Sequence, residues 1–440
     1  MSAVRWLWTR RERRPVFVWA TLLTLGTLLV YPFVDFWLRS ADIASDFAFR
    51  DYGAYHLAVD RWLSGETIYQ ERSTGGFHGT YLYPPVVLFL FWPVAAHLQF
   101  RTAAIVWMVV SVAVLWVALQ ALVRALGYGP RWYERVGLLW LVTGFHPLLL
   151  GVKLGQTVGL QAGLLSLVAA AMIGDEDSDR RAWASGVLTA LVGVVKPAYA
   201  PVGAHLLRDG RRMKAAIVTG LVSLWISIRA FGFDVHRTYL EVLWWGIEKG
   251  SDARAPGLWL PPYYKPLSWL PVALAVRLVA CAAIVVLAVR ARPRARTHVF
   301  ALGVAAFPLL TPTTYTYYLA ALLPAVLILL AGELDCDGYP AVPVLALLCV
   351  SLHAYGLKFI VDVLPNLLPP FGLLRPAFPL FQPGLWGNAA LVVLAAVRVA
   401  QHVDGLDALL SLGDDEGTDL DAGKDVDADP NLEAETEDSA

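Results

Sequence analysis

Residues Val16–Val34 read VFVWATLLTLGTLLVYPFV, and this stretch indicates a membrane protein. Its nineteen residues carry no charge, and one helical crossing of a bilayer needs about 20 apolar residues. The stretch is too long for the apolar part of a typical signal peptide, and no typical small-residue cleavage site follows it. We therefore expect a helix that stays in the membrane as an anchor.

The remainder of the chain has the same apolar character. Of the 440 residues, 57% are hydrophobic and only 16% are charged, with a mean hydropathy of +0.55. Long apolar runs with few charges indicate many transmembrane helices. We therefore expect an all-α integral membrane protein with about twelve spans. These are Val16–Val34, Pro84–Leu98, Ala103–Val123, Val136–Leu150, Gly155–Ile173, Trp183–Leu206, Ala215–Phe231, Leu267–Val289, Val299–Leu310, Tyr318–Ala331, Val342–Val361 and Trp386–Val399.

Basic loops set the orientation, because cytoplasmic loops carry an excess of Lys and Arg. Arginines within 5–14, 208–212 and 290–296 place both termini in the cytoplasm and the loops 35–83, 232–265 and 365–385 outside. The basic loop 124–135 disagrees, because twelve spans place it outside. If Pro84–Leu98 were re-entrant, that loop would lie inside, and the later span would have to break near Lys196-Pro197. We expect the simpler twelve-span arrangement.

The charge distribution divides the chain into three parts. Residues 1–15 form a basic cytoplasmic segment, residues 16–402 the membrane domain, and residues 403–440 an acidic tail. From Asp404 onward the tail has fourteen acidic residues and one basic residue, so we expect it to be disordered and solvating. The three cysteines have no metal-like spacing, so no metal site is expected. No basic patch interleaved with aromatics suggests a nucleic-acid partner.

The segment Ser45–Tyr69, SDFAFRDYGAYHLAVDRWLSGETIY, follows the first apolar run and holds the best catalytic candidate. On a helix, Asp51, Tyr55, Ala58 and Trp62 share one face, and the Ser-Gly pair at 64–65 would end that helix. A carboxylate beside aromatic rings at the outer mouth of a membrane protein suits a general base that acts on a hydroxyl. A lone aspartate is more often an exposed loop or helix-terminal charge, and Asp46 and Asp60 are rivals.

Other polar residues interrupt the apolar runs. Lys153 and Gln156 either mark a membrane interface or belong to a polar pocket. Lys196 precedes a proline in an apolar run, where it should meet an anion such as phosphate or pair with a nearby carboxylate. The hydroxyl-rich stretch Thr311–Tyr318 suits contacts to a sugar, although an interfacial aromatic belt would look the same. Tyr83 precedes two prolines that alone would indicate only the start of a helix.

Several short motifs, in this order, resemble glycosyltransferase family 87, a group of membrane GT-C enzymes that includes polyprenol-phosphomannose-dependent mannosyltransferases. The resemblance covers most of residues 16–400 but not the acidic tail. The motifs are DYGAY (Asp51–Tyr55), WLSGETIY (Trp62–Tyr69), YPP (Tyr83–Pro85), GQ (Gly155-Gln156), KPAYAP (Lys196–Pro201) and TPTTYTYYL from Thr311. Where many bacterial members have a His-His pair, this chain has Tyr317-Tyr318, so no histidine role carries over.

The resemblance implies a GT-C fold with an outward cavity under juxtamembrane helices, and Asp51 as the catalytic aspartate. It implies inverting transfer of a hexose, with mannose first, from a polyprenyl- or dolichyl-phosphate sugar to a glycolipid or glycan acceptor outside the cell membrane, without a cofactor. Lys196, and less surely Lys153, would stabilise the leaving phosphate. The substrate-binding candidates are Tyr55, His56, Tyr83, Lys153, Gln156, Lys196, Thr314, Tyr317 and Tyr318.

Two other functions stay open. A transporter or flippase would also have a dozen spans, but it predicts internal repeats and paired broken helices, and no convincing repeat is visible. A non-catalytic subunit of a cell-envelope glycan complex would depend on the acidic tail and not on Asp51.

Overall fold

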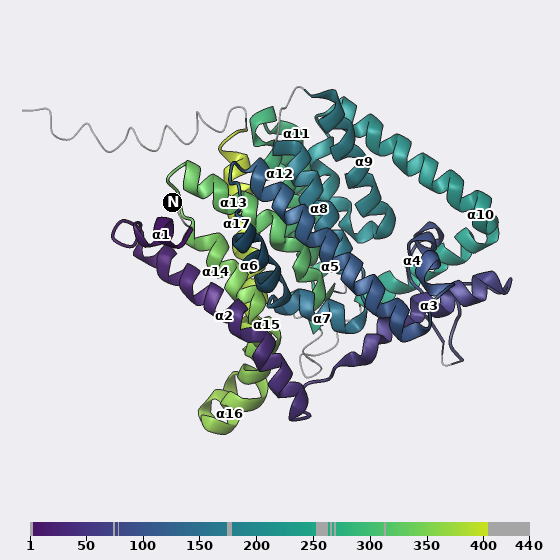
Figure 1. Cartoon of the computed structure of the whole chain (residues 1–440), viewed down its shortest axis with the longest axis horizontal. Helices are drawn as coiled ribbons and strands as arrows, with labels where there is room; N and C mark the ends of the chain where they lie inside the picture. Colours follow the sequence, from purple (N-terminus) through teal and green to yellow (C-terminus); the bar gives the residue numbers. More distant parts are fainter. Residues whose placement is uncertain are drawn as a thin grey trace, which may run out of the picture.

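The computed structural model describes residues 3–73, 75–77, 79–173, 178–251, 263–264, 266–267, 270–311 and 314–403, and it is almost entirely helical (Figure 1). The predicted all-α class is therefore confirmed. The α-helices are α1 (Ala3–Trp8), α2 (Pro15–Ser40), α3 (Arg50–Leu63), α4 (Leu88–Ala95), α5 (Phe100–Ala125), α6 (Trp132–Thr143), α7 (His146–Leu154), α8 (Val158–Ile173), α9 (Asp179–Val195), α10 (Gly210–Ser251), α11 (Ala273–Arg290), α12 (Arg296–Leu310), α13 (Leu323–Asp335), α14 (Ala341–Ser351), α15 (His353–Lys358), α16 (Leu364–Leu367) and α17 (Pro383–Ala400).

Shorter elements link these helices. Two two-residue strands, β1 (Tyr263–Tyr264) and β2 (Thr314–Tyr315), pair antiparallel, with Tyr263 opposite Tyr315. The remaining turns are the 3₁₀ segments η1 (Phe47–Phe49), η2 (Pro85–Val87), η3 (Pro197–Leu206), η5 (Pro293–Ala295), η6 (Thr316–Leu322) and η8 (Pro369–Phe381), and the π-helical segment η7 (Phe359–Val363). The acidic tail from Asp404 onward lies outside the described residues.

Among the described residues, six helices are long and apolar enough to cross a membrane, or eight if each of two bent pairs counts as one span. The multi-pass prediction is thus confirmed, whereas the number twelve is not. Several predicted spans are shorter or bent. For example, the polypeptide bends by 69° between α6 and α7, inside the predicted span Val136–Leu150. Short and broken helices are tolerated at membrane depth where neighbouring helices bury them.

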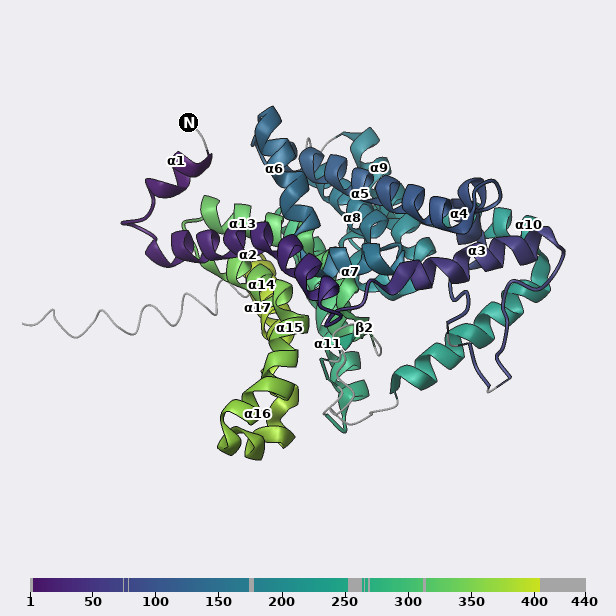
Figure 2. The same cartoon turned by 60° about the horizontal axis from the view of Figure 1, so that its bottom comes forward.

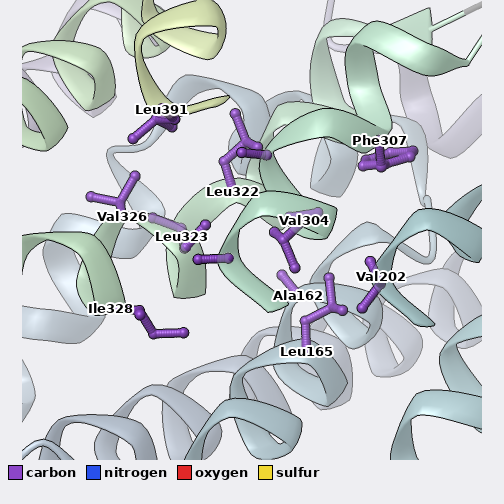
Figure 3. Close-up of a cluster of buried hydrophobic side chains, with 14 of the residues drawn as sticks. Ala162, Leu165, Val202, Val304, Phe307, Leu322, Leu323, Val326, Ile328 and Leu391 are labelled. Carbon is purple, nitrogen blue, oxygen red and sulfur yellow. The ribbon is translucent and has the colours of Figure 1, made fainter. Parts of the chain in front are cut away.

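The position of α12 in the core explains why its sequence is continuously apolar and has no polar face. Every residue from Val299 to Pro308 is buried, because α12 is surrounded by other helices. Figure 3 shows the surrounding side chains, which come from α8, α12, α13, α17 and the two 3₁₀ segments η3 and η6. Ala162 and Leu165 of α8 lie near Val304 of α12 in this cluster (Figure 3). The packed core therefore holds the two 3₁₀ segments that lead into the candidate site.

Basic residues gather at one end of the helix bundle. Arg211 at the start of α10 pairs with Asp179 at the start of α9. Arg296 at the start of α12 lies 3.4 Å from Asp209, measured from Nη2 to Oδ2. Arg124 at the end of α5 lines a cavity of about 660 Å³ together with the first turn of α9. The loops 124–135, 208–214 and 290–296 therefore share one end.

This arrangement favours the topology in which Pro84–Leu98 does not cross the membrane. Helical structure there covers only Pro85–Ala95, too short for a straight crossing of about 20 residues. The break that this alternative requires is present, because α9 ends at Val195, Lys196 has an extended backbone (φ −151°, ψ 103°) and η3 follows. The predicted crossing at Pro84–Leu98 is therefore not confirmed, because the helix described there has only 11 residues.

The other end of the molecule carries an aromatic group of elements. Helices α3 and α4 lie there beside the second half of α10, which turns back after a kink at Gly232 (φ 77°, ψ 172°) (Figures 1 and 2). Their buried residues form a separate cluster that includes Tyr52, Tyr55 and Phe91. The rings of Tyr55 and Phe91 stack with centroids 4.3 Å apart. This cluster fixes α3, and with it Asp51, against the helix bundle.

Candidate active site

Helix α3 places Asp51 in its first turn, where a carboxylate interacts favourably with the helix dipole. The helix begins after Phe49, whose backbone is left-handed (φ 57°), and it ends at Ser64 before Gly65 (φ 75°). The predicted helix and its end are therefore confirmed. Tyr55 on the same face is buried, whereas the Asp51 side chain keeps 25% of its surface exposed. The Asp51 carboxylate is therefore partly accessible at the surface of the protein.

Gln156 is the direct partner of Asp51. Its Nε2 donates a hydrogen bond of 2.6 Å to Asp51 Oδ2. The Gln156 backbone is fixed by the end of α7, where Gln156 N–H donates to the Gly151 carbonyl and Gly155 N–H to the Val152 carbonyl. This pair of bonds, with Gly155 left-handed (φ 79°), is the Schellman pattern of a helix C-terminus. The side chain that orients Asp51 is thus held by a rigid backbone.

Two tyrosines extend this contact into a hydrogen-bonded chain. Gln156 Oε1 accepts from the hydroxyls of Tyr55 (3.0 Å) and Tyr83 (3.1 Å). Tyr83 also shares a 3.0 Å hydrogen bond with the Thr157 hydroxyl. Burial raises the pKa of Tyr83 to about 12, so its hydroxyl stays protonated at neutral pH. The tyrosines therefore act as hydrogen-bond donors and acceptors rather than as bases.

Lys196 lies at the other end of this hydrogen-bonded series of side chains. Its Nζ donates to the Tyr83 hydroxyl at 3.3 Å. The same nitrogen lies 3.9 Å from the ring centroid of Tyr318, a cation–π contact. No carboxylate forms an ion pair with Lys196 in the parts of the chain that the structure describes. Of the two partners expected for Lys196, an anion and a nearby carboxylate, the described residues thus supply no directly bonded carboxylate.

The structure brings the Tyr317-Tyr318 pair into this site. The two rings meet edge to face with centroids 4.7 Å apart, and Tyr317 also stacks on Tyr315 at 5.3 Å. The Cβ of Tyr317 lies close to Gly151 of α7. Tyr318 supplies an aromatic wall for Lys196. The predicted residues Tyr317 and Tyr318 therefore lie at the site, next to Lys196.

Three of the predicted site residues are engaged elsewhere. His56 packs edge to face on Phe100, and its Nε2 lies 3.9 Å from Asp60 Oδ2. Lys153 Nζ forms a 2.8 Å ion pair with Asp35 Oδ1 instead of joining Lys196. Thr314 donates its hydroxyl to the Pro308 carbonyl at 3.2 Å, at the end of α12. The contacts described for these three residues are with other parts of the fold and not with Asp51 or Lys196.

Sequence reasoning missed two residues of the site. The Thr157 hydroxyl bonds Tyr83, and the polar Gly-Gln-Thr run within an apolar stretch could have indicated it. Arg50 Nε lies 3.4 Å from Asp51 Oδ1, and its side chain is largely exposed. An exposed pair of this kind contributes little to stability. It adds positive charge at the mouth of the site.

The charges and hydrogen bonds of this arrangement suit a particular type of reaction. It presents a partly exposed carboxylate at one end of a hydrogen-bonded chain and an ammonium group at the other. A carboxylate in this position can accept a proton from a hydroxyl. An ammonium group fixed in partly buried surroundings can stabilise a negative charge that develops during a reaction. Together they suit an acid–base reaction in which a hydroxyl attacks and an anion leaves.

Gly155→Ala is expected to destabilise the protein by roughly 3 kcal/mol. A side chain at φ 79° is strained, and its Cβ would lie 2.5 Å from the Cβ of Tyr52 in α3. The substitution pushes α3 away from α7 and lowers the melting temperature of the purified protein. Gly193→Ala in α9 is the matched control, because nothing lies within 4 Å of its new Cβ. Equal melting temperatures for the two variants would contradict this packing.

The comparisons with known proteins identify the family of the chain. A family model described as glycosyltransferase family 87 matches residues 81–312. No curated protein matches the chain. Among solved structures, the crystal structure of ArnT from Cupriavidus metallidurans bound to undecaprenyl phosphate is similar at 13% sequence identity. The match has a TM-score of 0.40 and covers 88% of this chain and 78% of that chain.

Proposed function

Because the chain belongs to glycosyltransferase family 87, we propose that it transfers a hexose, with mannose as the first candidate, from a polyprenyl-phosphate sugar to an acceptor hydroxyl. Family membership makes the protein a glycosyltransferase, and its long apolar helices make it a multi-pass membrane protein. The donor, the sugar and the mechanism are our proposal. A lipid-linked donor explains why the enzyme is embedded, since the polyprenyl chain stays in the bilayer.

In the proposed reaction, the acceptor oxygen attacks the anomeric carbon of the donor sugar. Asp51 takes the proton of the attacking hydroxyl as general base. The bond between the anomeric carbon and the phosphate oxygen breaks, and the polyprenyl phosphate leaves with the electron pair. Attack from the face opposite the leaving group inverts the anomeric configuration. Lys196 stabilises the negative charge that grows on the phosphate.

One observation carries this proposal. Asp51, Gln156, Tyr83 and Lys196 form one continuous hydrogen-bonded chain, with the carboxylate and the ammonium at its two ends. The two charged groups are thus held near each other without forming a direct ion pair. A base and an anion-stabilising cation are thereby held in one connected site, as the proposed reaction requires.

The basic end of the bundle is the cytoplasmic end in the proposed topology, since positive loops stay inside. The candidate site lies at the opposite end, so it would face the outside, with both termini in the cytoplasm. The acceptor is then a glycolipid or glycan of the outer surface. No cofactor is assigned to the reaction, and the part of the chain that the structure describes holds no group of three metal-ligating side chains.

The proposal is tested with the purified enzyme in lipid nanodiscs. Polyprenyl-phosphate mannose, glucose and galactose are compared with the corresponding nucleotide sugars, and a glycan and lipid extract of a deletion strain supplies the acceptor. We expect transfer from one lipid-phosphate sugar only, and NMR of the product should show the inverted anomer. Transfer from a nucleotide sugar, or retention of configuration, would contradict the proposed donor or mechanism.

A further inference from the structure

A second charged cluster lies beside the candidate site. Asp35, near the end of α2, is 1% exposed. Its Oδ1 accepts from Lys153 Nζ at 2.8 Å and its Oδ2 from Arg39 Nε at 2.9 Å. The Lys153 side chain is 11% exposed, whereas that of Arg39 is 38% exposed. Asp35 and Lys153 are therefore a buried ion pair that joins α2 to α7.

The position of Lys153 connects this pair to the reaction. Lys153 lies in the last turn of α7, three residues before Gln156. The two backbone bonds that end α7 hold Gln156 in one orientation relative to that turn. A shift of the last turn of α7 therefore moves Gln156 and the hydrogen bond that it donates to Asp51.

The residues packed around the last turn of α7 leave little space for such a shift. Gly155 touches Tyr52 of α3 so closely that an added Cβ would overlap the Tyr52 side chain. On the other side, Lys153 Nζ lies 5.9 Å from the ring centroid of Phe47, in the turn that leads into α3. The last turn of α7 is thus held between the ion pair and the start of α3. Small displacements at such positions have large effects on rates.

We propose that Asp35 is a positioning residue for the transfer reaction, acting through Lys153 and the end of α7 on Gln156 and Asp51. This inference rests on the proposed function. It also gives Lys153 a role different from phosphate binding. Lys153 already has a carboxylate partner, so its charge is neutralised, whereas Lys196 has no ion pair within the described residues.

The charge of Lys153 allows the proposal to be tested by a double substitution. Asp35→Asn leaves a buried ammonium group without its counter-charge, which is a severe perturbation of a buried pair. Lys153→Met removes that ammonium while keeping an unbranched side chain. The double variant Asp35→Asn with Lys153→Met therefore removes the isolated charge and leaves the last turn of α7 packed by an apolar side chain.

The experiment measures kcat and the KM for polyprenyl-phosphate mannose in nanodiscs for the two single variants and the double variant. We expect Asp35→Asn to lower kcat by about 10-fold to 100-fold with less than about a twofold change in KM, since its effect is on alignment. We expect the double variant to regain most of the lost kcat. A lysine that bound phosphate directly would instead make the double variant as slow as, or slower than, Asp35→Asn.

Glu333→Gln is the matched control. Glu333 is also a buried carboxylate paired with a cation, and its Oε2 accepts from Arg398 Nη2 at 2.6 Å at the basic end of the bundle. We expect this variant to lower the melting temperature and leave kcat unchanged. An unchanged kcat in Asp35→Asn, no recovery in the double variant, or an equal kcat loss in Glu333→Gln would overturn the inference. A wild-type enzyme without transferase activity would overturn the proposed function instead.

Discussion

Replacing Asp51 by Asn is expected to lower kcat by about 10²-fold to 10⁴-fold, the range that a positioned general base contributes. Asn has the same size, and its side-chain oxygen can still accept the hydrogen bond that Gln156 donates to Asp51. The geometry of α3 should therefore survive, and KM for donor and acceptor should change little. Initial-rate kinetics with the protein in nanodiscs separate the two parameters.

Asp60→Asn is the control for this prediction. Asp60 lies on the same helix as Asp51, but its side chain is 54% exposed and its neighbour is His56. Its neutralisation should leave kcat within about twofold of the wild type, as is usual for exposed surface charges. An Asp51→Asn enzyme with normal kcat, or an equal loss in both variants, would rule out Asp51 as the base.

Lys196→Met should lower kcat by about 10²-fold to 10³-fold, comparable to the loss of one preorganised group that stabilises developing charge. Methionine fills a similar volume beside Tyr318 but brings no charge to the leaving phosphate. The effect should fall on kcat more than on KM, because the phosphate gains charge as the bond to the sugar breaks. The measurement is single-turnover transfer with saturating donor, which isolates the chemical step.

Lys214→Met is the matched control, because Lys214 is exposed in the basic segment at the start of α10. It should behave like the wild type. If Lys196→Met raised only KM, Lys196 would bind donor and transition state equally well, and its role in stabilising the leaving group would be wrong.

The features of the site that depend only on local sequence pattern could be predicted. The face of α3 and the glycine that ends this helix follow from spacing of 3.6 residues per turn and from the tolerance of glycine for positive φ. The proline after Lys196 indicated a possible helix break, and the break is present. Apolar run length identified the membrane class because it depends on composition rather than on contacts.

Long-range contacts were beyond sequence reasoning. Nothing near Lys153 in the sequence indicates that Asp35, 118 positions away, is its partner. The contact of Tyr318 with Lys196 likewise depends on how η6 packs beside the end of α9. The predicted number of twelve spans is not confirmed, for a related reason. An apolar run such as Val136–Leu150 predicts a single helix. The polypeptide can nevertheless bend within such a run where neighbouring helices bury the break.

If Asp51 is the base for sugar transfer at the cell surface, replacing it changes the surface glycans and glycolipids, and mass spectrometry measures that change. Three strains are compared: the wild type, a deletion, and the deletion complemented with Asp51→Asn at normal protein level. We predict that the deletion loses one hexose unit and that the Asp51→Asn protein fails to restore it. A wild-type profile in the Asp51→Asn strain would rule out Asp51 as the base and favour a transporter or a non-catalytic subunit.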